Sequence, residues 1–351
     1  MTKNDTVRVC AAHVAPVFLD AKATTSKICS LIAEASRDGA DLIAFPEAML
    51  PGFPVWVALQ APINSHDFFK RMVAQSVAPG GPEVAQIREA AKKHEIFVSL
   101  GISETSPASV GCIWNSNLLI NDHGDIISHH RKLVPTFYEK LVWANGDGAG
   151  LKVAPTRIGK IGMLICGENT NPLAKYSLIA QGEQLHISSY PPIWPTRRTG
   201  EAGAYNLENA IRIRAGAHSF EGKVFNVVAS ACVDKTLEKF VDAMGKDAKG
   251  ILEDTPRAVS MILGPTGDVI SDTLCEDEGL LHKEVDLKDC VEPKQFHDVS
   301  GYYNRYDVFE FSLNTRRQEP MTINEPRRDP NVLEQKSDRV HTEAIQPKGR
   351  P

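Results

Sequence analysis

The sequence predicts a layered α/β protein whose strands are covered by helices. Short apolar runs of strand length, such as 41–45 and 161–165, alternate with longer stretches of helical period, such as 20–37. Continuous apolar runs are typical of strands that are buried on both faces, whereas half-exposed strands alternate apolar and polar residues. A strand, a helix and a second strand within residues 7–47 form one βα unit, which favours the α/β class.

The remaining elements repeat this alternation along the chain. Turn signals at 121–125, 159–160 and 265–268 mark three hairpins. The glycine-rich interval 145–150 lacks the Gly-Lys-Ser/Thr end of a phosphate-binding loop, so we interpret it as a turn. We expect helices at 20–37, 68–78, 82–94, after Asn171 and at 207–219. We expect strands at 7–14, 41–47, 96–102, 112–120, 126–130, 151–156, 161–165, 184–188, 224–230, 259–264, 269–270 and 280–285.

Composition excludes several classes of protein. The chain has 351 residues, of which 42% are hydrophobic and 24% charged, as in ordinary globular proteins that bury a large core. A formal net charge of -5, with no basic tract before the C-terminal tail, argues against a nucleic-acid-binding surface. No apolar run is long enough to span a membrane. We therefore expect neither a nucleic acid nor a membrane as a partner.

The cysteines and the first residues indicate the compartment. Seven cysteines are widely spaced with no Cys-x-x-Cys pair, which is poor evidence for disulfides or zinc and fits a reducing environment. The N-terminus lacks the charged and then apolar pattern of a secretion leader. A cytoplasmic location is the resulting expectation.

The patterned part of the chain ends near residue 286. From Arg316 onward charged, proline and polar residues dominate, and such a composition cannot bury a core by itself. We expect one folded domain over 1–286 and a C-terminal extension over 287–351 that is partly disordered or contacts another subunit.

The stretch 161–172 presents a candidate nucleophile. An apolar run ends at Cys166, Gly167 follows, and Asn171 with Pro172 fits the N-cap and first residue of a helix. A strand, a tight corner and a helix would lift the thiol toward a cleft, as the corresponding turn does for the serine of many hydrolases. The alternative is that the cysteine is a small buried hydrophobic residue, the commoner role at the end of an apolar strand.

Two further strands end in residues whose side chains could take part in catalysis. Glu47 follows an apolar strand and Lys132 closes a hairpin strand, and polar residues at the carboxyl ends of strands collect around one cleft in layered α/β sheets. Separately, Glu47 could cap a turn and Lys132 could be a solvated strand end. Together with Cys166 they form a coherent set, because a carboxylate can take the thiol proton and an ammonium group can stabilise the charge of an intermediate.

Three short blocks resemble the signature of the nitrilase (carbon–nitrogen hydrolase) superfamily: Phe45-Pro46-Glu47, the RKLVPT run at 131–136, and the CGEN run at 166–169. The resemblance covers roughly residues 7–286. It implies a four-layer αββα sandwich that dimerises through its helix layers, with Glu47 as general base, Lys132 as cationic stabiliser and Cys166 as nucleophile. It also implies that Glu139 helps position the lysine and water; the alternative is an exposed loop carboxylate.

The details of the blocks resemble the nitrile-cleaving branch. Amidase-type members commonly carry an aspartate two residues after the cysteine, whereas Glu168 stands there in this chain. Gly167 departs from the bulkier residue, often tryptophan, of many nitrilases and leaves space beside the nucleophile. The resemblance implies hydrolysis of an organic nitrile to the carboxylic acid and ammonia. An amidase, a cyanide-hydrolysing enzyme and a non-enzymatic scaffold are the alternatives.

Other residues and partners complete the expectations. Phe53, Tyr190 and Trp194 are candidates to line the substrate pocket, although core packing explains them equally well. His129 and His130 in a hairpin strand are better explained as one inward and one outward side chain than as metal ligands. We expect no cofactor and no metal. The resemblance implies a homodimer that assembles into a larger, helical or filamentous homo-oligomer.

Overall fold

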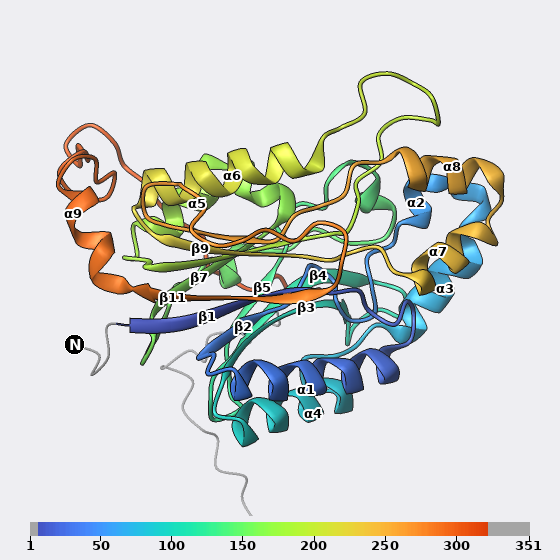
Figure 1. The fold of residues 1–351 in the computed structure, drawn as a ribbon, viewed down its shortest axis with the longest axis horizontal. Coiled ribbons are helices and arrows are strands. Elements are labelled where there is room, and N and C mark those ends of the chain that lie inside the picture. Colours follow the sequence, from blue (N-terminus) through green and yellow to red (C-terminus); the bar gives the residue numbers. More distant parts are fainter. Residues whose placement is uncertain (1–5, 322–351) are drawn as a thin grey trace, which may run out of the picture. The chain divides into compact units, whose positions relative to one another are not determined.

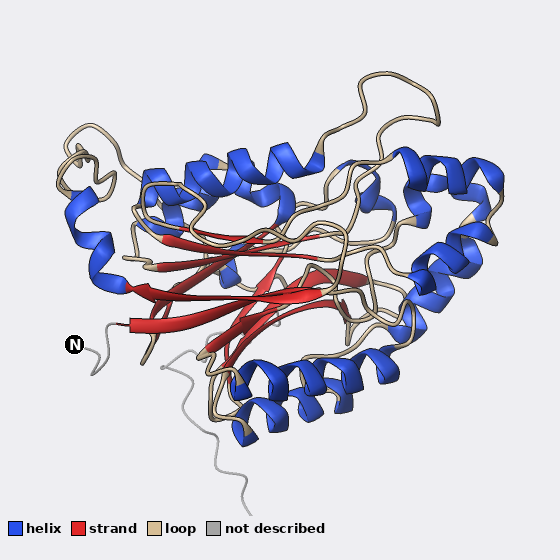
Figure 2. Ribbon diagram, viewed as in Figure 1, coloured by secondary structure: helices blue, strands red, loops and turns tan. Residues whose placement is uncertain are grey.

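A computed structural model describes residues 6–321, and one compact unit extends to Gln318. Figure 1 shows two β-sheets stacked face to face, with the helix pair α5 and α6 over one sheet and the pair α1 and α4 under the other. The strands lie between the helix layers throughout (Figure 2). The predicted α/β class and the αββα order of layers are confirmed.

The first sheet has the strand order β11-β1-β2-β3-β4-β5. β1, β2 and β3 are parallel, while β11, β4 and β5 join antiparallel to their neighbours. In the sequence α1 lies between β1 and β2, and α4 lies between β2 and β3, because parallel neighbouring strands need a crossover connection. The elements are β1 (Thr6–His13), α1 (Ala21–Arg37), β2 (Leu42–Ala44), α4 (Pro82–Lys93), β3 (Phe97–Thr105), β4 (Ile113–Ile120), β5 (Ile126–Arg131) and β11 (Gly279–Asp286).

The second sheet has the strand order β10-β9-β8-β7-β6. β7, β8 and β9 are parallel, and their connections contain the two helices that cover this sheet. The expected hairpin partner at 269–270 is reduced to a single bridge between Leu263 and Val269. The elements are β6 (Ala154–Thr156), β7 (Gly159–Ile165), α5 (Pro172–Ile179), β8 (Leu185–Tyr190), α6 (Leu207–Gly222), β9 (Phe225–Ser230) and β10 (Met261–Leu263).

Apolar side chains fill the spaces between successive layers. Alternate residues of one strand serve two different spaces: Ile43 faces α1 and α4, whereas Leu42 and Ala44 face the second sheet. On the second sheet, Leu164 packs toward α5 while Met163 packs between the sheets. This double burial is the reason that the strand sequences are apolar without alternation.

A further group of helices lies beside the sheets: α2 (Trp56–Leu59), α3 (His66–Gln75), α7 (Lys235–Asp242) and α8 (Lys246–Asp254). The sequence pattern does not predict α7 and α8, because few of their residues are apolar. The few that are, including Leu237, Val241 and Leu252, pack in one cluster with Trp56 and Phe18. These helices therefore form a wall built on an apolar cluster separate from the sheets.

The chain after β11 forms a 3-10 turn and the short helix α9 (Val291–Lys294). Arg317 pairs with Asp147 at 3.2 Å, but most of the predicted extension, residues 322–351, lies outside the described residues. The division of the chain at residue 286 stays a prediction. All seven cysteines are free thiols, and no helix within 6–321 is both long and apolar enough to cross a membrane.

Candidate active site

The structure brings the predicted site residues together at the carboxyl ends of strands from both sheets. Glu47 follows β2, Lys132 follows β5 and Cys166 follows β7. One carboxylate oxygen of Glu47, one of Glu139 and the sulfur of Cys166 all lie within 4.8 Å of one another. Residues that are far apart in the sequence thus share one small space between the two sheets.

Lys132 joins the two glutamates. Its Nζ donates to Glu47 Oε1 at 2.7 Å and to Glu139 Oε2 at 2.5 Å, and all three side chains are fully buried. The exposed-loop alternative for Glu139 is therefore wrong. The backbone N–H of Thr136 also donates to Glu139 Oε2 at 2.9 Å, and the indole of Trp194 donates to its Oε1 at 3.3 Å. Glu139 is thus held on three sides and in turn fixes the ammonium group.

The cluster holds two carboxyl groups, Glu47 and Glu139, but one ammonium group, Lys132, and this imbalance shifts the pKa values of Glu47 and Lys132. Burial raises the pKa of Glu47 to about 7, Lys132 opposes the rise and Glu139 adds to it. Burial alone would lower the pKa of Lys132, but Glu139 and Glu47 outweigh it and raise this pKa well above its usual value. Glu47 is therefore poised to exchange a proton near neutral pH, while Lys132 stays charged.

The two oxygens of Glu47 have different environments. Oε1 accepts hydrogen bonds from Lys132 and from Asn115 Nδ2, both at 2.7 Å. Oε2 is buried and has no hydrogen-bond partner within the described residues. The backbone carbonyl of Asn115 accepts the backbone N–H of Lys132 at 2.8 Å, so a single residue of β4 positions both Glu47 and Lys132. Oε2 is the oxygen that is free to take a proton.

Cys166 begins a 3-10 helix, η4 (Cys166–Thr170), in a left-handed backbone conformation with φ of 50°. The α-helix α5 starts only after this turn, with Asn171 as N-cap and Pro172 as first residue, as predicted. Burial raises the pKa of the Cys166 thiol well above its usual value, Glu47 adds to the rise, and Lys132 offsets it in part. The resting sulfur is therefore a protonated thiol.

Backbone strain gathers around these residues. Ala48 follows Glu47 with φ of 46°, Phe137 lies in the loop after Lys132 with φ of 50°, and Cys166 itself has φ of 50°. A positive φ costs a side-chain-bearing residue about 1–3 kcal/mol and is found mainly where function requires the geometry. The surrounding packing must hold these three turns in place.

A close backbone approach places Glu47. Gly101 of β3 lies so near the loop after β2 that a Cβ at this position would come within 2.2 Å of the Pro46 carbonyl oxygen. A side chain here would push the loop away from the sheet, and the carboxylate of Glu47 with it. Glycine at this position therefore allows the loop to lie across the strand end.

Glu168 connects the turn that begins at Cys166 to the end of β5, next to Lys132, a role that the sequence pattern did not predict. Its carboxylate accepts the backbone N–H groups of Ile165 at 2.9 Å and Leu133 at 2.6 Å, and it pairs with His130 Nε2 at 2.8 Å. Burial by itself would raise the pKa of Glu168, but His130 and the two N–H groups lower it overall. A carboxylate two residues from a candidate nucleophile was the available signal.

A second buried polar group lies behind the turn. Asn169 donates to the carbonyl oxygen of Cys166 at 3.1 Å and contacts His186 Nε2 at 3.0 Å. Glu183 binds both His186 and His218, at 2.7 and 2.8 Å. These residue types could ligate a metal, but each oxygen of Glu183 already has an imidazole nitrogen at hydrogen-bond distance. In the cluster of Glu47, Glu139 and Cys166, the ammonium group of Lys132 lies between the two carboxylates, where a metal ion would otherwise bind.

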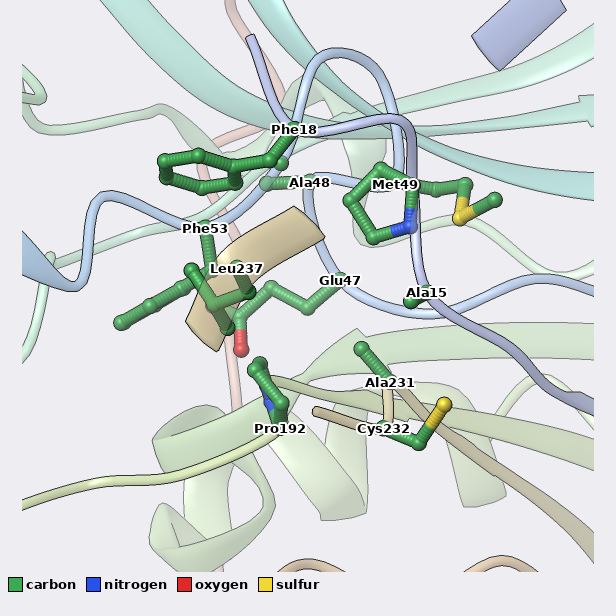
Figure 3. A pocket seen from close by; sticks show the side chains of 12 residues that line it. Ala15, Phe18, Glu47, Ala48, Met49, Phe53, Pro192, Ala231, Cys232 and Leu237 are labelled. Carbon is green, nitrogen blue, oxygen red and sulfur yellow. The ribbon is translucent and has the colours of Figure 1, made fainter. Parts of the chain in front are cut away.

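The three predicted pocket residues lie around this site. Phe53 packs edge-on against Trp143 and, with Glu47, lines a small cavity of about 10 Å³, enough for one water molecule (Figure 3). Trp194 stacks on Tyr138 with ring centres 5.2 Å apart. Tyr190 is fully buried at the end of β8, the strand that pairs with β7. Their contact with substrate stays a prediction.

A larger hollow of about 430 Å³ opens beside the nucleophile turn, with Gly167 and Thr170 in its wall. The space beside Gly167 is occupied in part by Thr136, whose Oγ1 would lie 2.7 Å from a Cβ added to this glycine. Glycine at position 167 thus permits Thr136, in the loop after Lys132, to pack closely on the turn that begins at Cys166.

Comparisons with known proteins identify relatives across most of the chain. The family model described as carbon–nitrogen hydrolase matches residues 6–295. A nitrilase from Penicillium rubens is 31% identical over 90% of this chain and 95% of its own length. An aliphatic nitrilase from Rhodococcus rhodochrous is 31% identical over 90% of this chain and 81% of its own length. An arylacetonitrilase from Macrophomina phaseolina is 32% identical over 93% and 97%.

Solved structures share the fold at low sequence identity. A carbon–nitrogen hydrolase from Helicobacter pylori superimposes with a TM-score of 0.67 at 17% identity, covering 88% of this chain and 99% of its own. Nit3 from Saccharomyces cerevisiae, a member of the nitrilase superfamily, gives a TM-score of 0.65 at 16% identity, covering 86% and 97%.

Proposed function

The chain belongs to the carbon–nitrogen hydrolase family, and we propose that within it the protein is a nitrilase that converts an organic nitrile to the carboxylic acid and ammonia. The observation that carries the proposal is the buried set of Glu47, Lys132, Glu139 and Cys166 at the strand ends. Identity of about 31% to proteins named as nitrilases, over nine-tenths of the chain, supports the choice of substrate class.

The first step forms a bond between the Cys166 sulfur and the nitrile carbon. Glu47 Oε2 takes the thiol proton, since Oε1 is already held by Lys132 and Asn115. The proton then passes to the nitrile nitrogen and gives a thioimidate, which restores the Glu47 carboxylate. Lys132 and backbone N–H groups at the turn stabilise the negative charge that builds on the nitrogen.

Hydrolysis consumes two water molecules. Glu47 takes a proton from the first water as the water oxygen bonds to the thioimidate carbon, and passes that proton to the nitrogen, which gives a tetrahedral intermediate with a hydroxyl and an NH₂ group. The hydroxyl proton then passes to the nitrogen as the carbon–nitrogen bond breaks, so that ammonia leaves and the carbonyl of a thioester forms. The resulting thioester is attacked by a second water in the same way, which releases the carboxylic acid and returns the thiol. Because the cluster is buried, bulk water does not reach the intermediates. The reacting water is expected beside Glu47, whose Oε2 has no other hydrogen-bond partner among the described residues.

Replacement of the nucleophile tests the assignment directly. Cys166→Ala should abolish ammonia release while the protein stays folded, because the side chain is small and alanine fits its space. Cys290→Ala, at a buried cysteine in the 3-10 turn after β11, is the matched control and should retain turnover. Ammonia release by Cys166→Ala at the wild-type rate would overturn the role of Cys166.

Matched nitrile and amide pairs separate a nitrilase from an amidase of the same family. The proposal expects ammonia from the nitrile at a higher kcat/KM than from the corresponding carboxamide, with cyanide included to test the smallest nitrile. Turnover of the amides alone would assign the protein to amidases instead. A scaffold without activity would release ammonia from none of them.

We also propose that the protein works as a homodimer that builds larger homo-oligomers. Apolar side chains are exposed on the helix layer of α5 and α6, at Leu173, Ile213 and Phe220, and such residues favour contact with another surface. Sedimentation of the full chain and of a chain ending at Gln318 should give a dimer or a larger species for the first and a smaller one for the second.

A further inference from the structure

Arg214 of α6 lies near the nucleophile without an acidic partner. Its guanidinium donates to Thr170 Oγ1 and to the Tyr205 hydroxyl, both at 2.7 Å, and within residues 6–321 no carboxylate pairs with it. Other arginines do have such partners: Arg131 binds Glu104, and Arg212, two residues away on α6, binds Glu208. Arg214 is half-buried, so its charge is only partly compensated by water.

The guanidinium lies over the turn that begins at the nucleophile. Thr170, which it binds, is the last residue of η4, and Cys166 is the first. A 3-10 helix rises about 2 Å per residue, which puts Thr170 roughly 8 Å along the turn from the cysteine. Thr170 and Gly167 both line the hollow of about 430 Å³, so part of this turn is open to a ligand.

A buried hydroxyl without a partner lies on the same side. Tyr190 ends β8 next to Cys166, because Ile165 and Ser189 pair in the parallel register of β7 and β8. Its ring packs with Ile211 and Ala215 of α6, the residues on either side of Arg214 along that face. The Tyr190 side chain is fully buried, and its hydroxyl makes no hydrogen bond within the described residues. An unused donor and an unpaired cation therefore adjoin the nucleophile.

The lining of the hollow contains one charged residue of each sign, so it does not by itself repel an anion. Its charged lining residues are Lys140, which is exposed, and Glu168, whose carboxylate is already satisfied by His130 and two backbone N–H groups. A guanidinium with free N–H groups is well suited to bind a carboxylate through two parallel hydrogen bonds.

We propose that Arg214, assisted by the Tyr190 hydroxyl, binds a carboxylate group of the substrate, so that the preferred nitriles are ω-cyano carboxylic acids. In ω-cyanobutanoate about 6 Å separates the nitrile carbon from a carboxylate oxygen, and a hydrogen bond to the guanidinium adds about 2.9 Å, a span comparable to the length of roughly 8 Å of the turn between Cys166 and Thr170. This substrate class rests on the proposed nitrilase function.

The test compares ω-cyanobutanoate with pentanenitrile, in which a methyl group replaces the carboxylate. For the wild-type enzyme kcat/KM should be higher on the anionic nitrile. Arg214→Gln should lower kcat/KM on ω-cyanobutanoate about 10- to 100-fold more than on pentanenitrile, mainly through KM, and Arg214→Lys should recover part of the loss. Arg212→Gln, on the same helix, is the control and should change neither value.

Equal losses on both nitriles in Arg214→Gln would overturn the proposal and leave Arg214 as a group that acts on the nucleophile. Direct binding separates this result from a failure of the nitrilase function. Glutarate, a dicarboxylate of similar length, should bind Cys166→Ala protein in calorimetry, and Arg214→Gln should weaken that binding at least tenfold. If glutarate binds but no nitrile is hydrolysed, the function fails while the anion site stands; if glutarate does not bind, the site fails.

Discussion

Replacing Glu139 by glutamine should shift the pH at which the enzyme becomes active. Glu139 adds to the rise that burial causes in the pKa of Glu47, and both carboxylates share the single ammonium group of Lys132. The glutamine amide can turn its oxygen toward Lys132 and Thr136, which keeps the two shorter contacts. Its NH₂ group then faces the Trp194 indole, whose 3.3 Å contact is the longest of the three. The substitution thus removes one negative charge with little change of shape.

The magnitude follows from the separation of the two charges. Carboxylate oxygens of Glu47 and Glu139 lie within 4.8 Å. At an effective dielectric constant of about 20, two unit charges at that distance repel by roughly 3.5 kcal/mol, or about 2.5 pH units. Lys132 screens part of this repulsion, so we expect the pKa of Glu47 to fall by about one to two pH units in Glu139→Gln.

The assay is the pH dependence of kcat/KM for ammonia release from a neutral nitrile. Wild-type activity should rise with pH through about 7, because only the deprotonated Glu47 carboxylate accepts the thiol proton. In Glu139→Gln this rise should occur at lower pH, with a lower plateau because Lys132 is held less firmly. Glu221→Gln, at a surface carboxylate paired with Lys175, is the control. An acid limb that stays at the wild-type pH, or moves upward, would refute the electrostatic reasoning.

Two further substitutions probe the same framework. Lys132→Met leaves two buried carboxylates without a cation and should abolish turnover and cost about 3–5 kcal/mol of stability. In urea unfolding this loss should be larger at pH 8 than at pH 5, because a glutamate whose folded pKa is raised destabilises the fold only once it is deprotonated. Glu168→Gln replaces two accepting oxygens by one and leaves the N–H of Ile165 or Leu133 unpaired, so thermal unfolding should show a loss of about 1–3 kcal/mol. Unchanged stability in Glu168→Gln would show that the carboxylate does not hold the turn.

Local sequence patterns predict a residue's structural role correctly where that role depends only on its neighbours in the chain. The buried strands were found because double burial requires apolar residues at successive positions, as at 42–44 and 161–165. The cap at Asn171 and Pro172 was predictable because it uses only groups within one helical turn. The intervening 3-10 turn was not expected, since its left-handed first residue is held by tertiary contacts.

Helices α7 and α8 escaped the sequence analysis for a related reason. Their apolar residues are few and find their partners in Phe18 and Trp56, which lie some two hundred positions earlier in the chain, as the residue numbers show. Their own sequences have too few apolar residues at helical spacing to distinguish these helices from a polar loop. Glu168 and Asn115 were missed because their partners are backbone groups and side chains brought close only by the fold.

The sequence by itself determined the class of fold, the strand ends and the chemical identity of Glu47, Lys132 and Cys166. Tertiary structure alone decided that Glu139 is buried against Lys132. It also decided that, among residues 6–321, one oxygen of Glu47 has no hydrogen-bond partner and Arg214 has no carboxylate partner. The physical reason is that apolar periodicity and capping act over a few residues, whereas a pKa or a hydrogen bond depends on whichever groups two stacked sheets bring within a few ångströms.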